Sequence, residues 1–152
     1  MKFSKIKSTD SIKSIIKSIS DIDLDVEGLW GYDIDSSTII NSYGKFLAKD
    51  FESLLCSLRS HIQMSMTLSE EERYTSISAN EILRDRITKN GKTYDKVTYM
   101  INATKELEFK NFIKEYKENH GDENFDLTEH FKQRENCKIN IEEVYWFDIT
   151  NL

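Results

Sequence analysis

The side chains best placed to do chemistry are the acids of the segment DIDLDVEG, which begins at Asp21. Asp21, Asp23 and Asp25 occupy alternate positions, as do the first three ligands of an EF-hand calcium loop. That loop also requires glycine at its sixth position and a bidentate glutamate at its twelfth, where this sequence has Val26 and Tyr32. The segment therefore does not form an EF-hand, and we predict no metal site in it.

The same segment has the alternation of a β-strand with one solvated side. Six acids and no basic residue occur between residues 21 and 35: Asp21, Asp23, Asp25, Glu27, Asp33 and Asp35. The apolar residues that alternate with them are Ile22, Leu24, Val26, Trp30, Tyr32 and Ile34. A period of two predicts a strand, bent at Gly28 or Gly31, whose acids face solvent. Because clustered like charges repel, these acids form either a plain solvated face or an acidic surface for a partner.

Other reactive side chains lack the spacing of known sites. The histidines and cysteines are His61, His120, His130, Cys56 and Cys137, and they show no zinc-finger spacing. The chain has only 5 glycines, with no Gly-x-Ser-x-Gly segment and no glycine-rich phosphate loop. We therefore predict no zinc site, no cofactor and no hydrolase chemistry, and we expect both cysteines to be free thiols.

One enzymatic alternative stays open, a metal-dependent nuclease. Asp33, Asp35 and the triplet from Glu115 to Lys117 supply the carboxylates and the lysine that such enzymes use. In those enzymes the Glu-x-Lys pair shares one face of a strand. Here the triplet falls in a segment with helical periodicity, where positions two apart diverge. The pattern favours a protein without catalytic activity.

Length and charge narrow the class of protein. A chain of 152 residues fits one domain, so we predict a single domain over residues 1–152. The net charge of −6 disfavours binding to nucleic acid, which depends on lysine and arginine, and favours a basic protein partner. No apolar run approaches the roughly 20 residues that span a bilayer, and the start lacks an apolar signal-peptide core. We therefore expect a cytoplasmic protein without membrane contact.

Hydrophobic periodicity predicts the elements that position these residues. Helical spacing occurs over about 10–19, 44–64, 104–121 and 127–134, and strand-like alternation recurs from 139 to 149. Residues 78–90 fit either a helix or the first strand of a hairpin that turns at Asn90-Gly91. The facing pairs in the hairpin register are Arg86 with Asp95, Asp85 with Lys96, Ile87 with Tyr94 and Ile82 with Tyr99. They favour the hairpin, and the order of elements predicts an α+β fold, a mainly antiparallel sheet with helices packed on it.

Aromatic residues flank the acids at two places in the sequence. If Tyr145 and Phe147 face the core, Trp146 faces the other side of the sheet, together with Glu142 and Asp148. An exposed tryptophan among carboxylates is typical of an interaction hot spot, whereas a covering helix would make Trp146 part of the core. The predicted partner-binding residues are Asp23, Asp25, Trp30, Asp33, Asp35, Glu142, Trp146 and Asp148.

In its size, its acidity and its lack of a catalytic motif, the chain resembles bacterial immunity proteins that neutralise polymorphic toxins, such as those of contact-dependent inhibition systems. The resemblance is to the class, covers no defined motif and assigns no residue a role. It implies a non-catalytic inhibitor that binds one cognate toxin domain, often a nuclease encoded by the neighbouring gene. Two other interpretations stay open: the small nuclease above, and a phage accessory protein that mimics nucleic acid with its acidic strand.

Overall fold

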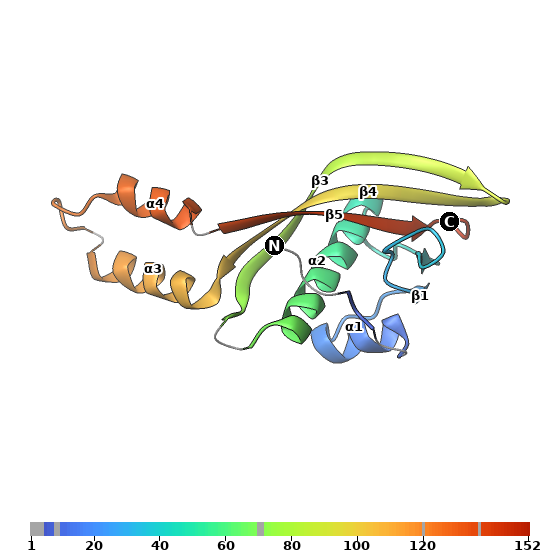
Figure 1. Ribbon diagram of the computed structural model, residues 1–152, viewed down its shortest axis with the longest axis horizontal. Coiled ribbons are helices and arrows are strands. Elements are labelled where there is room, and N and C mark those ends of the chain that lie inside the picture. Colours follow the sequence, from blue (N-terminus) through green and yellow to red (C-terminus); the bar gives the residue numbers. More distant parts are fainter. Residues whose placement is uncertain (1–4, 8–9, 70–71, 120, 137) are drawn as a thin grey trace.

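Five strands form one sheet in the computed structural model, which describes residues 5–7, 10–69, 72–119, 121–136 and 138–152 (Figure 1). His120 and Cys137 lie outside the described residues. The strands are β1 (Val26–Gly28), β2 (Thr38–Ile40), β3 (Tyr74–Lys89), β4 (Lys92–Lys105) and β5 (Lys138–Asp148), and their spatial order is β1-β2-β5-β4-β3. β2 and β5 are parallel, and the other neighbouring strands are antiparallel. The predicted α+β fold with a mainly antiparallel sheet is confirmed.

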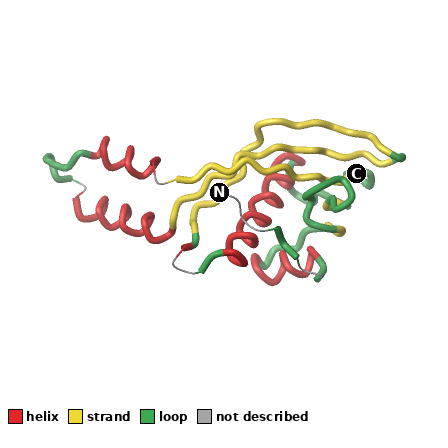
Figure 2. Tube along the Cα trace, in the orientation of Figure 1, coloured by secondary structure: helices red, strands yellow, loops and turns green. Residues whose placement is uncertain are grey.

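The helices lie on one side of this sheet and beyond one end of it. They are α1 (Ile12–Ser20), α2 (Ala48–Thr67), α3 (Glu106–Asn119) and α4 (Leu127–Asn136). α1 and α2 lie on one face, while α3 and α4 form a helical pair that projects from the end where β5 begins (Figure 1, Figure 2). No helix in the described part of the chain covers the opposite face, which we call the open face. None of the helices in the described ranges is long and apolar enough to cross a membrane.

The central helix α2 forms because apolar residues recur along it at helical spacing. Phe51, Leu55 and Ile62 are buried, as that spacing predicts, in one cluster with residues of β4 and β5. The helix begins at Ala48 rather than near residue 44, where Gly44 has a positive φ of 58° that is incompatible with a right-handed helix. α2 thus packs on the sheet against β3, β4 and β5.

Residues 78–90 belong to the hairpin and not to a helix, which resolves the alternatives that the sequence left open. Asn90 and Gly91 have φ values of 53° and 78°, the left-handed backbone that a two-residue type I′ turn requires. The predicted pairs of Asp85 with Lys96, Arg86 with Asp95 and Ile87 with Tyr94 are present. The predicted pair of Ile82 with Tyr99 is wrong, because a bulge in β3 places Glu81 opposite Tyr99.

Most of the acidic segment is not a strand, which corrects the prediction for residues 21–34. Only Val26–Gly28 pairs, and its partner is β2, a three-residue strand too short for its alternation to be read from the sequence. The strand ends at Gly28, where φ is 86°. The alternation itself persists without the strand, since Leu24 is buried and Asp25 is exposed.

The predicted helices of the C-terminal half and the final strand are confirmed as α3, α4 and β5. Asp126 caps α4, because its Oδ1 accepts a hydrogen bond from Glu129 N at 3.0 Å. The helical pair has an aromatic cluster of its own. The buried His130 ring lies 5.7 Å from the ring centroids of both Phe112 and Phe125. Local periodicity predicts these two helices. It does not predict that they pack on each other beyond the end of the sheet and not on the main core.

Candidate functional site

The open face carries the side chains of β3, β4 and β5 that point away from α2. Tyr145 and Phe147 are fully buried and stack at a centroid distance of 4.3 Å on the α2 side. Because side chains alternate along a strand, Trp146 and the other even-numbered residues of β5 point to the open face. The register continues this face through Lys96 and Asp85 beside Trp146, Thr98 and Leu83 beside Val144, and Met100 beside Glu142.

The centre of the open face is apolar, with Tyr94 buried and Trp146 half-buried. The rings of Tyr94 and Trp146 meet edge to face with centroids 6.4 Å apart, and Lys96 Nζ lies 5.3 Å from the Trp146 centroid. Val144 is half-buried, and Leu83 is 57% exposed. The wet face of an antiparallel sheet ordinarily carries polar residues. An uncovered apolar centre of this kind is typical of a surface that binds another molecule.

Exposed acids border this apolar centre. Asp35 is exposed and lines a hollow of about 300 Å³ at one end of the open face, together with Ile39 and Tyr94. Glu142 is exposed on β5, four residues before Trp146 on the same side of the strand. The structure therefore places these two predicted residues on one surface with Trp146.

Asp33 stabilises the turn that precedes β2. Its Oδ1 accepts a hydrogen bond from Ser36 N at 2.7 Å, and Asp33 N donates to Ser36 Oγ at 3.1 Å. Hydrogen bonds from Ser36 hold the pKa of the Asp33 carboxyl below its ordinary value, so the group is ionised at neutral pH. Asp33 is thus both an exposed acid and a structural residue of its own loop.

Lys17 partly neutralises the acidic segment. Lys17 Nζ lies 3.2 Å from the carboxylate of Asp21 and 3.3 Å from that of Asp23, and these contacts raise the pKa of Lys17. Asp25 and Asp35 differ from them, since neither forms a side-chain ion pair with any described residue. Asp25 and Asp35 are therefore the two acids of this segment most available to a partner.

Two of the residues predicted to bind a partner, Trp30 and Asp148, are buried in the structure. Trp30 is 4% exposed, because the alternation of buried apolar residues continues past Gly28 and brings this side chain into the core. Asp148 is 5% exposed, and its Oδ1 accepts hydrogen bonds from Thr150 N at 3.0 Å and Thr150 Oγ1 at 2.6 Å. Trp30 thus belongs to the core, whereas Asp148 is held by Thr150 and contributes to the wall of the hollow beside Asp35.

Arg59 of α2 anchors the loop between β1 and β2. The side chain is fully buried, and its guanidinium carbon lies 4.6 Å from the ring centroid of Tyr32 and 4.3 Å from that of Tyr145. Nη1 donates to Trp30 O at 3.0 Å, and Nη2 donates to Val144 O at 2.9 Å. The loop between β1 and β2 carries Asp33 and Asp35, and we call it the acidic loop. One guanidinium therefore joins the acidic loop, α2 and β5, and restricts the positions that the loop can take.

A sequence signal for this buried arginine exists but is weak. Phe51, Leu55, Arg59 and Gln63 follow one another at four-residue spacing, so two polar residues continue the apolar stripe of α2. Gln63 Nε2 donates to Tyr32 Oη at 2.6 Å, which gives the second polar residue its partner. A polar pair on the buried stripe of a helix indicates a buried hydrogen-bond network.

A second buried polar cluster holds the β3–β4 hairpin on α2. Glu52 is fully buried, and Arg84 Nη1 lies 3.2 Å from its Oε1 and 3.1 Å from Asp95 Oδ2. Arg86 forms two further hydrogen bonds with Asp95, and Arg84 Nη2 lies 2.6 Å from Glu81 Oε1. Lys49 Nζ also lies 3.9 Å from Glu81 Oε2, so three cations face three carboxylates, of which Glu52 has the side chain with no exposure. Burial raises the pKa of Glu52 to about 7.

We expect Glu52→Gln to remove a pH dependence of stability. Because the pKa of Glu52 is higher in the folded chain than in the unfolded chain, the folded chain binds the proton more tightly. The stability from this proton is fully present below the ordinary carboxyl pKa and is lost as pH rises through about 7. At about 1.4 kcal/mol per pKa unit, the loss is on the order of 3 kcal/mol. Urea unfolding of both chains from pH 4 to pH 8 measures it. A difference in unfolding free energy that does not change with pH would contradict the assignment.

The residues required by the nuclease alternative do not converge. Asp33 and Asp35 precede β2, whereas Glu115 and Lys117 lie on α3, at the opposite end of the molecule (Figure 1). Glu115 Oε2 lies 3.1 Å from His130 Nδ1 and so belongs to the aromatic cluster of the helical pair. Within the described ranges no three His, Cys, Asp or Glu side chains converge as metal ligands.

The chain was compared with protein-family models, curated proteins and solved structures. No protein-family model, no curated protein and no solved structure matches the chain significantly.

Proposed function

We propose that this chain is a non-catalytic binding protein, an immunity protein or inhibitor that neutralises a basic toxin, such as a nuclease, by tight complex formation. One observation carries the proposal: the open face combines an apolar centre at Trp146 with exposed acids at Asp35 and Glu142. Protein interfaces share this anatomy, an apolar centre inside a polar rim. The net charge of −6 supports a basic partner, because opposite charge accelerates association.

The proposed place of action is the bacterial cytoplasm, where an incoming toxin domain would reach its target. The rigid anchoring of the acidic loop by Arg59 supports tight binding, because a surface held in one conformation loses little entropy when a partner docks.

The test is a growth assay with the neighbouring gene. The C-terminal domain of the protein encoded immediately upstream is expressed in a laboratory bacterium, alone and together with this chain. We expect growth arrest in the first strain and normal growth in the second, and the purified proteins should form a complex. Growth arrest that this chain does not relieve, with no complex between the purified proteins, would rule out the pairing.

We expect the double variant Asp25→Asn, Asp35→Asn to associate with the toxin domain about tenfold more slowly, because it loses long-range attraction to a basic partner. The dissociation rate should change less, and the dependence of association on salt should weaken. Stopped-flow measurements at several salt concentrations give these rates.

The matched control is Asp50→Asn, Glu72→Gln, which changes the net charge equally. Asp50 lies at the start of α2 and Glu72 just before β3, and both side chains are exposed. Equal slowing by the two double variants would show that net charge alone, and not the positions of Asp25 and Asp35, governs association.

A further inference from the structure

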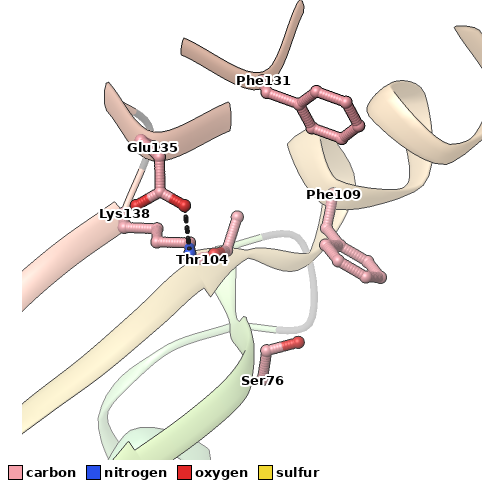
Figure 3. Close-up of a pocket in the computed structure, with 6 residues that line it drawn as sticks. All are labelled: Ser76, Thr104, Phe109, Phe131, Glu135 and Lys138. Carbon is pink, nitrogen blue, oxygen red and sulfur yellow. Dashed lines mark hydrogen bonds and ion pairs between the residues drawn. The ribbon is translucent and has the colours of Figure 1, made fainter. Parts of the chain in front are cut away.

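A pocket lies where the helical pair joins the sheet (Figure 3). Its volume is about 380 Å³, within the range of about 300–1,000 Å³ that ligand-binding pockets occupy. It is lined by Ser76, Thr104, Phe109, Phe131, Glu135 and Lys138. The phenyl rings come from α3 and α4, and the hydroxyl groups come from β3 and β4 (Figure 3). The pocket is thus built from five elements, β3, β4, β5, α3 and α4, and from both apolar and polar groups.

The walls of the pocket differ in chemistry. Phe131 is 45% exposed, although the same ring lies 5.2 Å from the His130 ring in the cluster of the helical pair. On the polar side, Lys138 Nζ lies 2.7 Å from Glu135 Oε1, and both side chains keep contact with solvent. An apolar group can therefore contact the phenyl rings while a cationic group beside it reaches the exposed Glu135 and shares its carboxylate with Lys138.

The pocket continues the open face described above. Thr104 and Lys138 are register partners, and they point to the same side of the sheet as Met100 and Glu142. Along β4, Tyr94 and Thr104 are separated by about 33 Å, estimated from the strand rise per residue. The hollow beside Asp35 therefore lies at one end of the open face and this pocket at the other.

The area of the open face indicates that a partner must also contact the helical pair. The three long strands β3, β4 and β5 at their usual spacing span about 10 Å, so a face about 33 Å long measures on the order of 300 Å². A stable interface buries about 800 Å² on each partner. The helical pair borders the open face and supplies the missing area.

We propose that this pocket is the anchor site for a bulky apolar side chain of the basic partner, and that a neighbouring lysine or arginine of the partner pairs with Glu135. The assignment rests on the proposed function. The basic partner follows from the acids that border the same face, Asp35 and Glu142. Anchor side chains that enter a preformed pocket carry a large share of the binding energy in protein complexes.

The first part of the test needs no toxin. The full ¹⁵N-labelled chain is titrated with N-acetyltryptophanamide up to its solubility limit, and with N-acetylglycinamide as a control for the backbone. We expect saturable shifts of the Ser76, Thr104, Phe131 and Lys138 amides with the first compound only. No saturable shift at these positions, or shifts only elsewhere on the open face, overturns the proposal.

The second part measures affinity for the toxin domain. We expect Phe131→Ala to weaken binding at least tenfold, while Leu127→Ala, an exposed apolar residue of the same helix that does not line the pocket, leaves binding unchanged. Phe131→Leu keeps an apolar side chain against His130 and should weaken binding by an intermediate factor, which separates loss of the anchor from unfolding of α4.

The outcomes distinguish this proposal from the proposed function. Unchanged toxin affinity in Phe131→Ala, in a chain that still neutralises the toxin, overturns the anchor and leaves the proposed function intact. Binding of N-acetyltryptophanamide by a chain that neutralises no toxin overturns the assignment of the occupant in favour of a small-molecule ligand.

Discussion

Replacing Arg59 by alanine will lower the free energy of unfolding by about 3–5 kcal/mol, because the change combines a large-to-small substitution in the core with one buried and one partly buried acceptor left without donors. Trp30 O and Val144 O lose the donors that now lie at 3.0 Å and 2.9 Å. The rings of Tyr32 and Tyr145 lose the cation between them. Urea unfolding measures the loss.

Arg59→Lys separates the charge from the geometry. A lysine keeps the positive charge but cannot donate to two carbonyls in a fixed fork or stack between two rings, so we expect it to recover only a minor part of the loss. Lys49→Ala is the control, because Lys49 is a cation of the same helix with a side chain that is 73% exposed. It should change the unfolding free energy by less than about 0.5 kcal/mol. A loss in Arg59→Ala as small as in the control would show that the buried network is not a major source of stability.

The same network links stability to the proposed surface. Arg59 does not touch the open face, yet it bonds both the loop before Asp33 and Asp35 and the backbone of β5 next to Trp146. Amide exchange of Trp146 reports on this coupling, because Trp146 N donates to Gly31 O at 2.8 Å. Faster exchange there in Arg59→Ala, beyond the change in global stability, is the expected sign that the loop has been released.

The elements that were predicted correctly from the sequence depend on local signals. The hairpin follows from Asn90-Gly91 and from facing pairs close to the turn, and the register is right until the bulge at Ile82, which local pairing cannot anticipate. β2 was not predicted because its three residues are shorter than any readable alternation, and its partner β5 lies about a hundred residues away along the chain. Contacts that are distant in sequence therefore account for the errors in the fold.

The residues of the candidate site also fall into those that local patterns predict and those that depend on contacts distant in sequence. Alternation alone predicts that Asp25 is exposed and that Trp146 points away from the core. The burial of Trp30 and Asp148 depends on how the loop and the C-terminal turn fold back on the sheet, which no local pattern encodes. The burial of Arg59 likewise depends on groups from two other elements. A charged residue on the apolar stripe of a helix was the available sign, and it identifies a polar network without identifying its partners.

Gly31→Ala tests whether the loop has room to move, and we expect it to cost about 3 kcal/mol or more. Gly31 has a φ of 73°, and an added Cβ would lie 2.3 Å from two ring atoms of Tyr145. The ring cannot withdraw easily, because it stacks on Phe147 at 4.3 Å and its hydroxyl lies 2.7 Å from Thr38 Oγ1. Gly44→Ala is the matched control: its φ of 58° is also positive, but among the described residues no heavy atom beyond its two chain neighbours lies within 4 Å of the added Cβ, so only the backbone cost of about 1 kcal/mol applies. Thermal and urea unfolding of both variants measure the difference, which isolates the contact with Tyr145. Equal losses in the two variants would mean that Gly31 serves only backbone geometry, and that the acidic loop can shift relative to β5 without penalty.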